Sequence, residues 1–205
     1  MTARTGVSDT VARVAGEPVP ASRVEERLAA LRTGPHAGLL PRGGREFRQL
    51  RRWIGQLVVA EAVCETAARR AGLVPAEDPL RLDESDEVAV VELGSLAAAV
   101  LDTSPYARGV YRHLLAASEV PDADAEDYYR RNRDLFRTPE ALARGGDAAL
   151  PYQRVRQRIQ TRLREAAARR QFLRWLDTQT TALVELCPGW EHPGDPAQPD
   201  NTHRH

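Results

Sequence analysis

The run from about residue 45 to residue 71 constrains the fold more than any other segment. Its apolar side chains recur at helical spacing on two faces rather than on one. One face carries Phe47, Leu50, Ile54, Leu57, Cys64 and Ala68, and the other carries Trp53, Ala60, Val63 and Ala67. A helix that is apolar on two faces needs neighbours on both sides, so we expect a central helix here, ended by Gly72.

The composition also favours a helical domain. Aromatic residues make up 5% of the 205 residues, so the core must depend on Leu, Val and Ala, which favours packed helices over a sheet sandwich. The formal net charge is zero, so no overall charge attracts the chain to nucleic acid or to an anionic membrane. All 29 basic residues are arginines, which excludes chemistry that needs a lysine Schiff base or a P-loop lysine.

Apolar periodicity and turn residues predict the remaining elements. Ser22 and Glu25 have the spacing of a capping box at the start of a first helix. Further helices are expected over about residues 85–101, from Ser104-Pro105, up to Asn132, and from Pro151. Residues 15–18 are expected to form a turn. Two short apolar strands, 11–14 and 182–186, lie at opposite ends of the chain, and because each is too short to stand alone we expect them to pair.

The predicted fold is therefore mainly α, a single helical domain with a short β ribbon that joins the N- and C-terminal segments. Its expected boundaries are a flexible N-terminus (1–9), the helical domain (10–187) and a disordered tail (188–205). The tail is expected to be disordered because it is rich in Pro, Gly, Asp and Asn and contains few apolar residues.

Several stretches, in this order, resemble SurA/PrsA-like parvulin-type chaperones. Residues 11–19, VARVAGEPV, are similar to the strand and turn with which those mature chains open. DYYRRN at 127–132, followed by Phe136 and Pro139-Glu140, resembles the segment that leads into their isomerase domain. Residues 150–176 and LVEL at 183–186 resemble the helix and strand that follow it. The resemblance implies a helical chaperone domain, like the N-terminal part of SurA and the peptide-binding part of trigger factor.

In that family an isomerase domain of roughly a hundred residues follows the DYYRRN-like segment, a usual domain size. Here residues 141–150 are expected to be a short linker, and ARGGDAA within it is too short to fold into a catalytic domain. We therefore expect no prolyl isomerase activity. The N-terminal residues contain no apolar stretch of the length of a signal peptide or membrane helix, so a cytoplasmic location is expected.

Glu61 and His113 are the strongest candidates for acid–base chemistry, because each lies on an apolar helical face. A carboxylate at Glu61 is costly unless an arginine or a backbone donor meets it, so it forms either an ion pair between two helices or an acid in a pocket. His113 is either a hydrogen-bonded core histidine or a catalytic base. Tyr128 and Tyr129 would complete the set in an enzyme.

No metal and no cofactor are expected. Cys64 and Cys187 are far apart and form no CxxC motif, and the histidines of the tail have no ordered ligand partners in the sequence. The arginine-rich last helix is interpreted as a solvated face, or as a complement to the acidic segment 77–92, because no aromatic stacking pattern accompanies it. Neither nucleic acid nor a membrane is an expected partner.

Two functions of different classes are compatible with these features. The first is a non-enzymatic, chaperone-like protein that holds a polypeptide client in a helical apolar cradle. Its groove is expected to be lined by Phe47, Trp53, Leu57, Tyr106 and Val110. The second is an accessory protein or unusual enzyme of a biosynthetic pathway that binds a small hydrophobic substrate on the same scaffold. The binding function is preferred, because the chain lacks a recognised nucleophile or metal motif. A homodimer is also compatible with the sequence.

Overall fold

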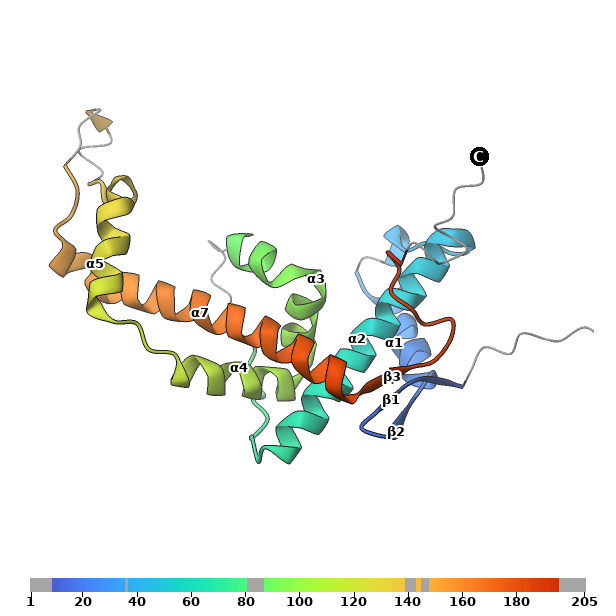
Figure 1. Ribbon diagram of the computed structural model, residues 1–205. Coiled ribbons are helices and arrows are strands. Elements are labelled where there is room, and N and C mark those ends of the chain that lie inside the picture. The colour runs from blue at the N-terminus through green and yellow to red at the C-terminus, as the bar shows by residue number, and fades with distance from the viewer. Residues whose placement is uncertain (1–8, 36, 81–86, 139–142, 145–147, 196–205) are drawn as a thin grey trace, which may run out of the picture.

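The computed structural model describes residues 9–35, 37–80, 87–138, 143–144 and 148–195, and it is mainly α with a small antiparallel sheet, as predicted (Figure 1). The helices are α1 (Ser22–Thr33), α2 (Gly44–Arg70), α3 (Glu87–Thr103), α4 (Pro105–Ala117), α5 (Asp122–Arg131) and α7 (Tyr152–Leu183), with 3-10 turns η1 (Ala37–Leu39) and η2 (Arg133–Phe136). The strands are β1 (Thr10–Val14), β2 (Glu17–Pro20) and β3 (Val184–Leu186).

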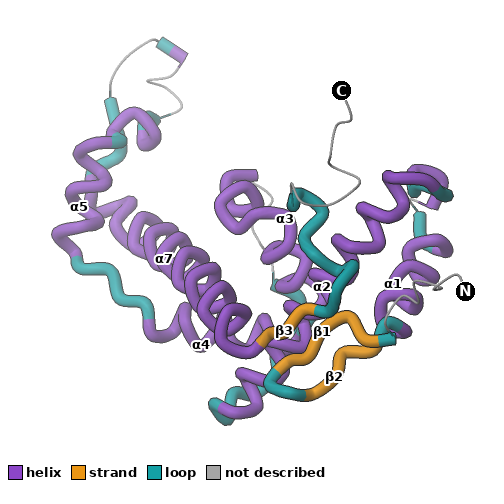
Figure 2. The backbone as a smooth tube through the Cα atoms, turned by 45° about the vertical axis from the view of Figure 1, so that its right-hand side comes forward, coloured by secondary structure: helices purple, strands orange, loops and turns teal. Residues whose placement is uncertain are grey.

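The predicted pairing of the two terminal strands is confirmed. β1 runs antiparallel to β3, with Ala12 opposite Leu186 and Val14 opposite Val184. β1 also pairs with β2, so the expected turn is a hairpin whose two central residues, Ala15 and Gly16, have positive φ angles of 53° and 87°. The sheet order is β2-β1-β3 (Figure 2). The two prolines of β2 are tolerated because this strand lies at an edge.

α2 is the central helix that the two apolar faces predict. It contacts α1, α3, α4, α7 and the sheet. Gly72 follows its end with a φ of +65°, and the backbone N–H of Leu73 donates to the carbonyl of Ala68 over 2.9 Å, which completes a left-handed C-terminal cap.

α7 spans the molecule and belongs to two hydrophobic cores (Figure 1). Its C-terminal half buries Phe172 and Leu176 in the main core, together with α2, α3, α4 and the sheet. Its N-terminal half buries Val155 and Ile159 in a smaller core with α5 and η2. At roughly 100° per residue, Ile159 and Phe172 lie about 140° apart round the helix axis. One helix therefore presents different faces to the two cores.

The smaller core forms an arm that consists of α5, η2 and residues 152–163 of α7. Asp122 at the start of α5 accepts hydrogen bonds from the Tyr152 hydroxyl and from Arg156 Nε, both over 2.6 Å. These contacts, the Tyr152 hydrogen bond first, lower the pKa of the Asp122 carboxyl below its ordinary value. They join α5 to α7 on the outside of the arm.

The chain doubles back on itself at the end of the arm. Arg137 and Ala149 form an isolated antiparallel bridge, and the backbone N–H of Leu150 donates to the carbonyl of Phe136 over 2.8 Å. Half of the expected linker, residues 141–150, lies outside the described residues. The described flanks of this segment lie side by side.

The predicted capping box at the start of α1 is wrong. Ala21 is the N-cap and already has helical angles (φ −63°, ψ −21°), and no side chain caps the helix. Ser22 therefore lies inside the first turn, where its hydroxyl cannot play the capping role. Glu25 instead pairs with Arg51 of α2, with a distance of 2.9 Å between Arg51 Nε and the Glu25 carboxylate.

The expected disordered tail is wrong for residues 188–195. Trp190 is 1% exposed and packs on α2, with the Arg51 guanidinium 4.1 Å from the centroid of its ring. Gln56 of α2 donates a hydrogen bond to the Trp190 carbonyl over 2.7 Å. One large aromatic side chain is enough to bind this Pro- and Gly-rich segment to the core. Residues 1–8 and 196–205 of the expected flexible termini lie outside the described residues.

α4 begins where Ser104-Pro105 predicts. The Ser104 hydroxyl accepts a hydrogen bond from the backbone N–H of Ala107. Arg108, 6% exposed, donates to the carbonyls of Leu101, Asp102 and Ala76. Two of these carbonyls end α3, where a positive charge is favourable. This buried arginine thus joins three segments of the main core.

Candidate functional site

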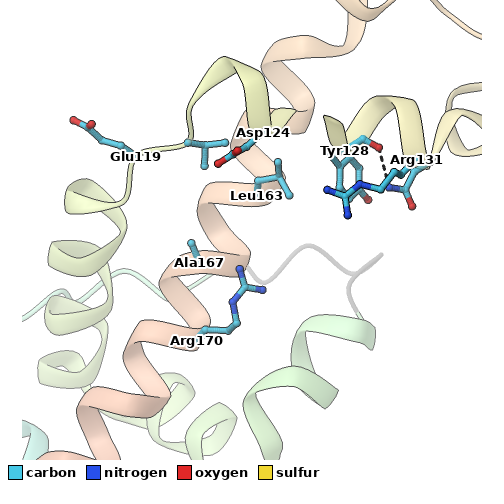
Figure 3. Close-up of a pocket in the computed structure, with 9 residues that line it drawn as sticks. Glu119, Asp124, Tyr128, Arg131, Leu163, Ala167 and Arg170 are labelled. Carbon is cyan, nitrogen blue, oxygen red and sulfur yellow. Dashed lines mark hydrogen bonds between the residues drawn. The ribbon is translucent and has the colours of Figure 1, made fainter. Parts of the chain in front are cut away.

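A cavity of about 310 Å³ lies where the arm meets the main core (Figure 3). It is lined by Glu119, Val120, Asp124, Tyr128, Arg131, Asn132, Leu163, Ala167 and Arg170. Glu119, Asp124, Arg131 and Arg170 are exposed, so the cavity is open to solvent at its charged side chains. We call it the α5–α7 groove.

Two helices supply the floor and one wall of the α5–α7 groove. Leu163, Ala167 and Arg170 are spaced by four and three residues, so they lie on one face of α7. Asp124, Tyr128 and Arg131 have the same spacing on α5. Leu163 continues the face that buries Val155 and Ile159 in the arm, and both Leu163 and Ala167 stay half-buried. The groove is therefore the open continuation of the small core.

The charged side chains of the groove differ in whether they form ion pairs within the protein. The Arg131 guanidinium forms an ion pair with Asp127 on the next turn of α5. Within the described part of the chain, Glu119, Asp124 and Arg170 form no ion pair. The groove therefore combines an apolar floor with carboxylate and guanidinium groups that can meet a partner.

A second hollow, of about 500 Å³, lies between the end of α1 and the following loop. It is lined by Arg32, Ala37, Gly38, Leu40, Pro41 and Arg42. Its charged residues are arginines only, and it has no aromatic side chain and no acid in its lining. The α5–α7 groove offers both charges and an apolar floor built on rigid helices, so we take it as the candidate site.

Glu61 forms the ion pair between helices, the first of its two predicted roles. It is 8% exposed on α2. Its Oε1 accepts from Arg27 of α1 and from the hydroxyl of Thr103 at the end of α3, each over 2.5 Å. Arg23 of α1 lies 3.9 Å from Oε2. These partners join three helices, and Glu61 does not line the groove.

His113 is not a core histidine: it is exposed on α4. The buried face of α4 passes through Ala107, Val110 and Tyr111, because the helix is rotated from the face expected around Tyr106 and His113. The rings of Tyr111 and Phe172 of α7 form a T-shaped pair, with their centroids 6.2 Å apart. That contact orients α4 and leaves His113 in solvent.

The two tyrosines of α5 pack around Phe136 in the arm, with ring centroids 6.5 Å (Tyr128) and 5.5 Å (Tyr129) from it. The Tyr129 hydroxyl donates to the Leu150 carbonyl over 2.8 Å. Only Tyr128 lines the groove. The four acid–base candidates therefore lie on three helices, α2, α4 and α5, and do not form one constellation.

The groove expected from Phe47, Trp53, Leu57, Tyr106 and Val110 is wrong. Leu57 and Val110 are 3% and 1% exposed, so they belong to the main core. Phe47 and Tyr106 are each covered by an arginine guanidinium 5.2 Å from the ring centroid, Arg32 and Arg69. Phe47 lies in the first turn of α2, whereas Tyr106 contacts Arg69 in its last turn, so the two aromatic residues lie at opposite ends of α2 and cannot line one surface. Trp53 is half-buried against the main core.

The residues of the α5–α7 groove other than Tyr128 were missed because they resemble ordinary parts of their helices. In the sequence, Leu163 and Arg170 are ordinary members of the arginine-rich last helix. The signal in the sequence is the drift of the apolar stripe of α7, from the face of Ile159 to that of Phe172. Where the apolar stripe of α7 changes face, the helix passes from one core to the other, and a gap is expected between the elements that pack on it in the two cores.

Burial raises the pKa of the Cys64 thiol to about 12, with a smaller contribution from the neighbouring Glu61 carboxylate. A thiol with so high a pKa is a poor nucleophile at neutral pH.

In the described residues, no group of three or more His, Cys, Asp or Glu side chains could hold a metal ion. None of the helices in this part of the chain is both long and apolar enough to cross a membrane.

Residues 10–44 match a family model described as "Family of unknown function (DUF7158)". The match covers the β1–β2 hairpin, α1 and η1, and it ends at the first residue of α2. It includes Arg23 and Arg27, which meet Glu61, but no residue of the α5–α7 groove. No curated protein and no solved structure matches the chain.

Proposed function

We propose that this protein binds a polypeptide client or partner in the α5–α7 groove, and that its action is non-enzymatic. The observation that carries the proposal is the groove itself, an open cavity of about 310 Å³ with an apolar floor and charged side chains at its rim. Open sites of this kind accept side chains of a partner, whereas enzyme pockets bury most of a small substrate.

The geometry of the arm supports the same proposal. Its small core and the outer contact of Asp122 with Tyr152 and Arg156 hold α5 at a fixed place along α7. A groove between two helices that are fixed in this way can bind a partner with little loss of conformational entropy, because its walls are already ordered. The resemblance of the sequence to SurA/PrsA-like chaperones also favours polypeptide binding, because the helical part of those proteins holds clients.

The alternative, a small hydrophobic substrate bound by an accessory protein or enzyme, has less support from the site. The four acid–base candidates do not meet, and only Tyr128 lines the groove. The cytoplasmic location and the homodimer stay predictions.

The direct test is suppression of the aggregation of a chemically denatured client, combined with binding of a labelled unfolded polypeptide. Ala167→Trp should fill the floor of the groove and reduce both activities. Ala182→Trp is the matched control, since Ala182 is an exposed alanine of the same helix outside the groove. Melting curves establish that both variants are folded.

The outcomes separate the alternatives. Equal loss or equal retention of binding in the two variants would place the binding site elsewhere. A parent protein that neither protects nor binds a polypeptide would refute the proposal. If a calorimetric screen then found a small hydrophobic ligand that Ala167→Trp excludes, the small-molecule function would replace it.

A further inference from the structure

The charges of the α5–α7 groove are separated rather than mixed. In Figure 3, Glu119 and Asp124 lie at the upper left of the apolar floor, whereas Arg131 and Arg170 lie to its right and below it. Leu163 and Ala167 occupy the space between them. The groove thus has an acidic side, an apolar middle and a basic side.

Some charged side chains of the arm are already paired within the protein. Asp122 meets Arg156, and Asp127 meets both Arg130 and Arg131. Arg170 differs, because it is exposed, lines the cavity and has no ion pair within the described ranges. The acids at the opposite side, Glu119 and Asp124, share these three properties. Asp124 also lies in the first turn of α5, where a carboxylate is favourable.

The dimensions of the groove limit how far apart the matching charges of a partner can be. Leu163 and Arg170 are two turns apart on α7, a rise of about 10 Å. An extended polypeptide advances about 3.3 Å per residue, so about three residues cover this length. The partner's charged residues must therefore lie one or two positions from the residue that reaches the floor.

We infer that the α5–α7 groove selects polypeptide segments in which an apolar residue lies between an acidic and a basic residue. The inference rests on the proposed function and names the class of segment that the groove binds. The apolar side chain packs on Leu163 and Ala167, the acidic side chain meets Arg170, and the basic side chain meets Glu119 and Asp124. Electrostatic complementarity of this kind sets which partner is chosen more than how tightly it binds.

The test uses the full chain and labelled nonapeptides that carry three residues at alternate positions, with Gly or Ser elsewhere. The matched peptide contains Glu, Leu and Arg, the neutral peptide Gln, Leu and Gln, and the basic peptide Arg, Leu and Arg. Fluorescence anisotropy should give about three- to tenfold tighter binding of the matched peptide than of the neutral one, as expected of two exposed ion pairs. The difference should shrink as salt is raised.

Arg170→Glu supplies the decisive comparison, because it should reverse the preference rather than abolish binding. The basic peptide should then bind more tightly than the matched peptide, while the neutral peptide changes little. Arg174→Glu is the control, since Arg174 is exposed one turn further along α7 and does not line the groove. It should leave the order of the three peptides as it is in the parent protein.

Failure of this inference is distinguishable from failure of the proposed function. If all three peptides bind the parent equally and Arg170→Glu changes nothing, the charge selection is wrong although polypeptide binding stands. If none of the peptides binds and no unfolded polypeptide binds either, the proposed function is wrong. A preference that Arg174→Glu reverses as well would show general attraction to the arginine-rich helix instead of selection by the groove.

Discussion

At the residue scale, Gly55 is the position at which α2 accepts the ring of Trp190. A Cβ atom at Gly55 would lie 2.7 Å from Cε3 of that ring, too close for ordinary packing. Alanine usually stabilises a helix interior relative to glycine by about 0.5–1 kcal/mol, whereas overpacking costs about 1–3 kcal/mol. Because Trp190 is buried, we expect Gly55→Ala to lower the free energy of unfolding by about 1–2 kcal/mol, measured by denaturant titration.

The control for this prediction is the same substitution in a Trp190→Ala background. With the ring removed, Gly55→Ala should be neutral or stabilising, because only the helix propensity remains. An equal destabilisation in both backgrounds would mean that the contact with Trp190 is not the cause.

Cys64 and Cys187 should differ in reactivity. Burial, with a smaller contribution from Glu61, raises the pKa of the Cys64 thiol to about 12, whereas Cys187 is half-buried near the surface. At pH 8 in the native state an alkylating reagent should modify Cys187 at least about tenfold faster than Cys64, and denaturant should remove the difference. Mass spectrometry of the labelled peptides measures both rates.

The same pKa shift predicts a dependence of stability on pH. The folded-state pKa of Cys64 lies above its unfolded value of 9.0, so the unfolded chain loses this proton first. The contribution of the Cys64 thiol to the free energy of unfolding is fully present below pH 9 and decreases as the pH rises from 9 towards 12. Cys64→Ala should lose this part of the alkaline slope, and an unchanged slope would contradict the assignment.

At the scale of elements, α7 joins two cores of unequal size. Ile159, 1% exposed, lies in the small core of the arm, and Phe172, 0% exposed, lies in the main core. Ile159→Ala and Phe172→Ala should each lower the free energy of unfolding by about 2–5 kcal/mol, because both side chains are packed in a core. The two substitutions should loosen different parts of the protein, because the small core contains few residues and can open while the main core stays folded.

Hydrogen exchange gives the measurement. Ile159→Ala should increase exchange in α5 and the first turns of α7 and leave the protection of α2 as in the parent. Phe172→Ala should increase exchange in α2 and α4 and lower the melting temperature of the whole protein. If Ile159→Ala reduced protection in α2 to the same extent, the arm and the main core would be one cooperative unit.

At the scale of the whole molecule, the two ends of the described chain close the fold. β1 is the central strand of the sheet, and its side chains Val11, Ala12 and Val14 are buried in the main core. Burial of a valine contributes about 1.5 kcal/mol or more, so deletion of residues 1–19 should cost several kcal/mol and lower the melting temperature of the whole protein. Deletion of residues 1–8, which leaves β1 in place, is the control. An unchanged melting temperature after removal of 1–19 would show that the sheet is dispensable.

The fold was largely predictable because its main elements carry strong local signals. The two apolar faces of α2, the glycine after it and the Ser-Pro start of α4 each follow from helix geometry. The pairing of residues 11–14 with 184–186 was predictable because neither strand can be stable alone. The capping box failed for a local reason, since the hairpin before α1 brings Ala21 into helical conformation.

The groove was not predictable from periodicity, because it depends on which face each helix turns to its neighbours. Val110 and Leu57 are apolar residues on helices, and only the packing of α2 and α4 in the main core makes them core residues rather than groove residues. Arg170 and Leu163 form a groove because α5 crosses α7 where its apolar face changes partner. The sequence carries that change as a drift in its apolar spacing, but the position of α5 depends on contacts across the chain, such as that of Asp122 with Arg156. Local spacing thus specifies the helices, and the contacts between distant residues specify the surface they leave open.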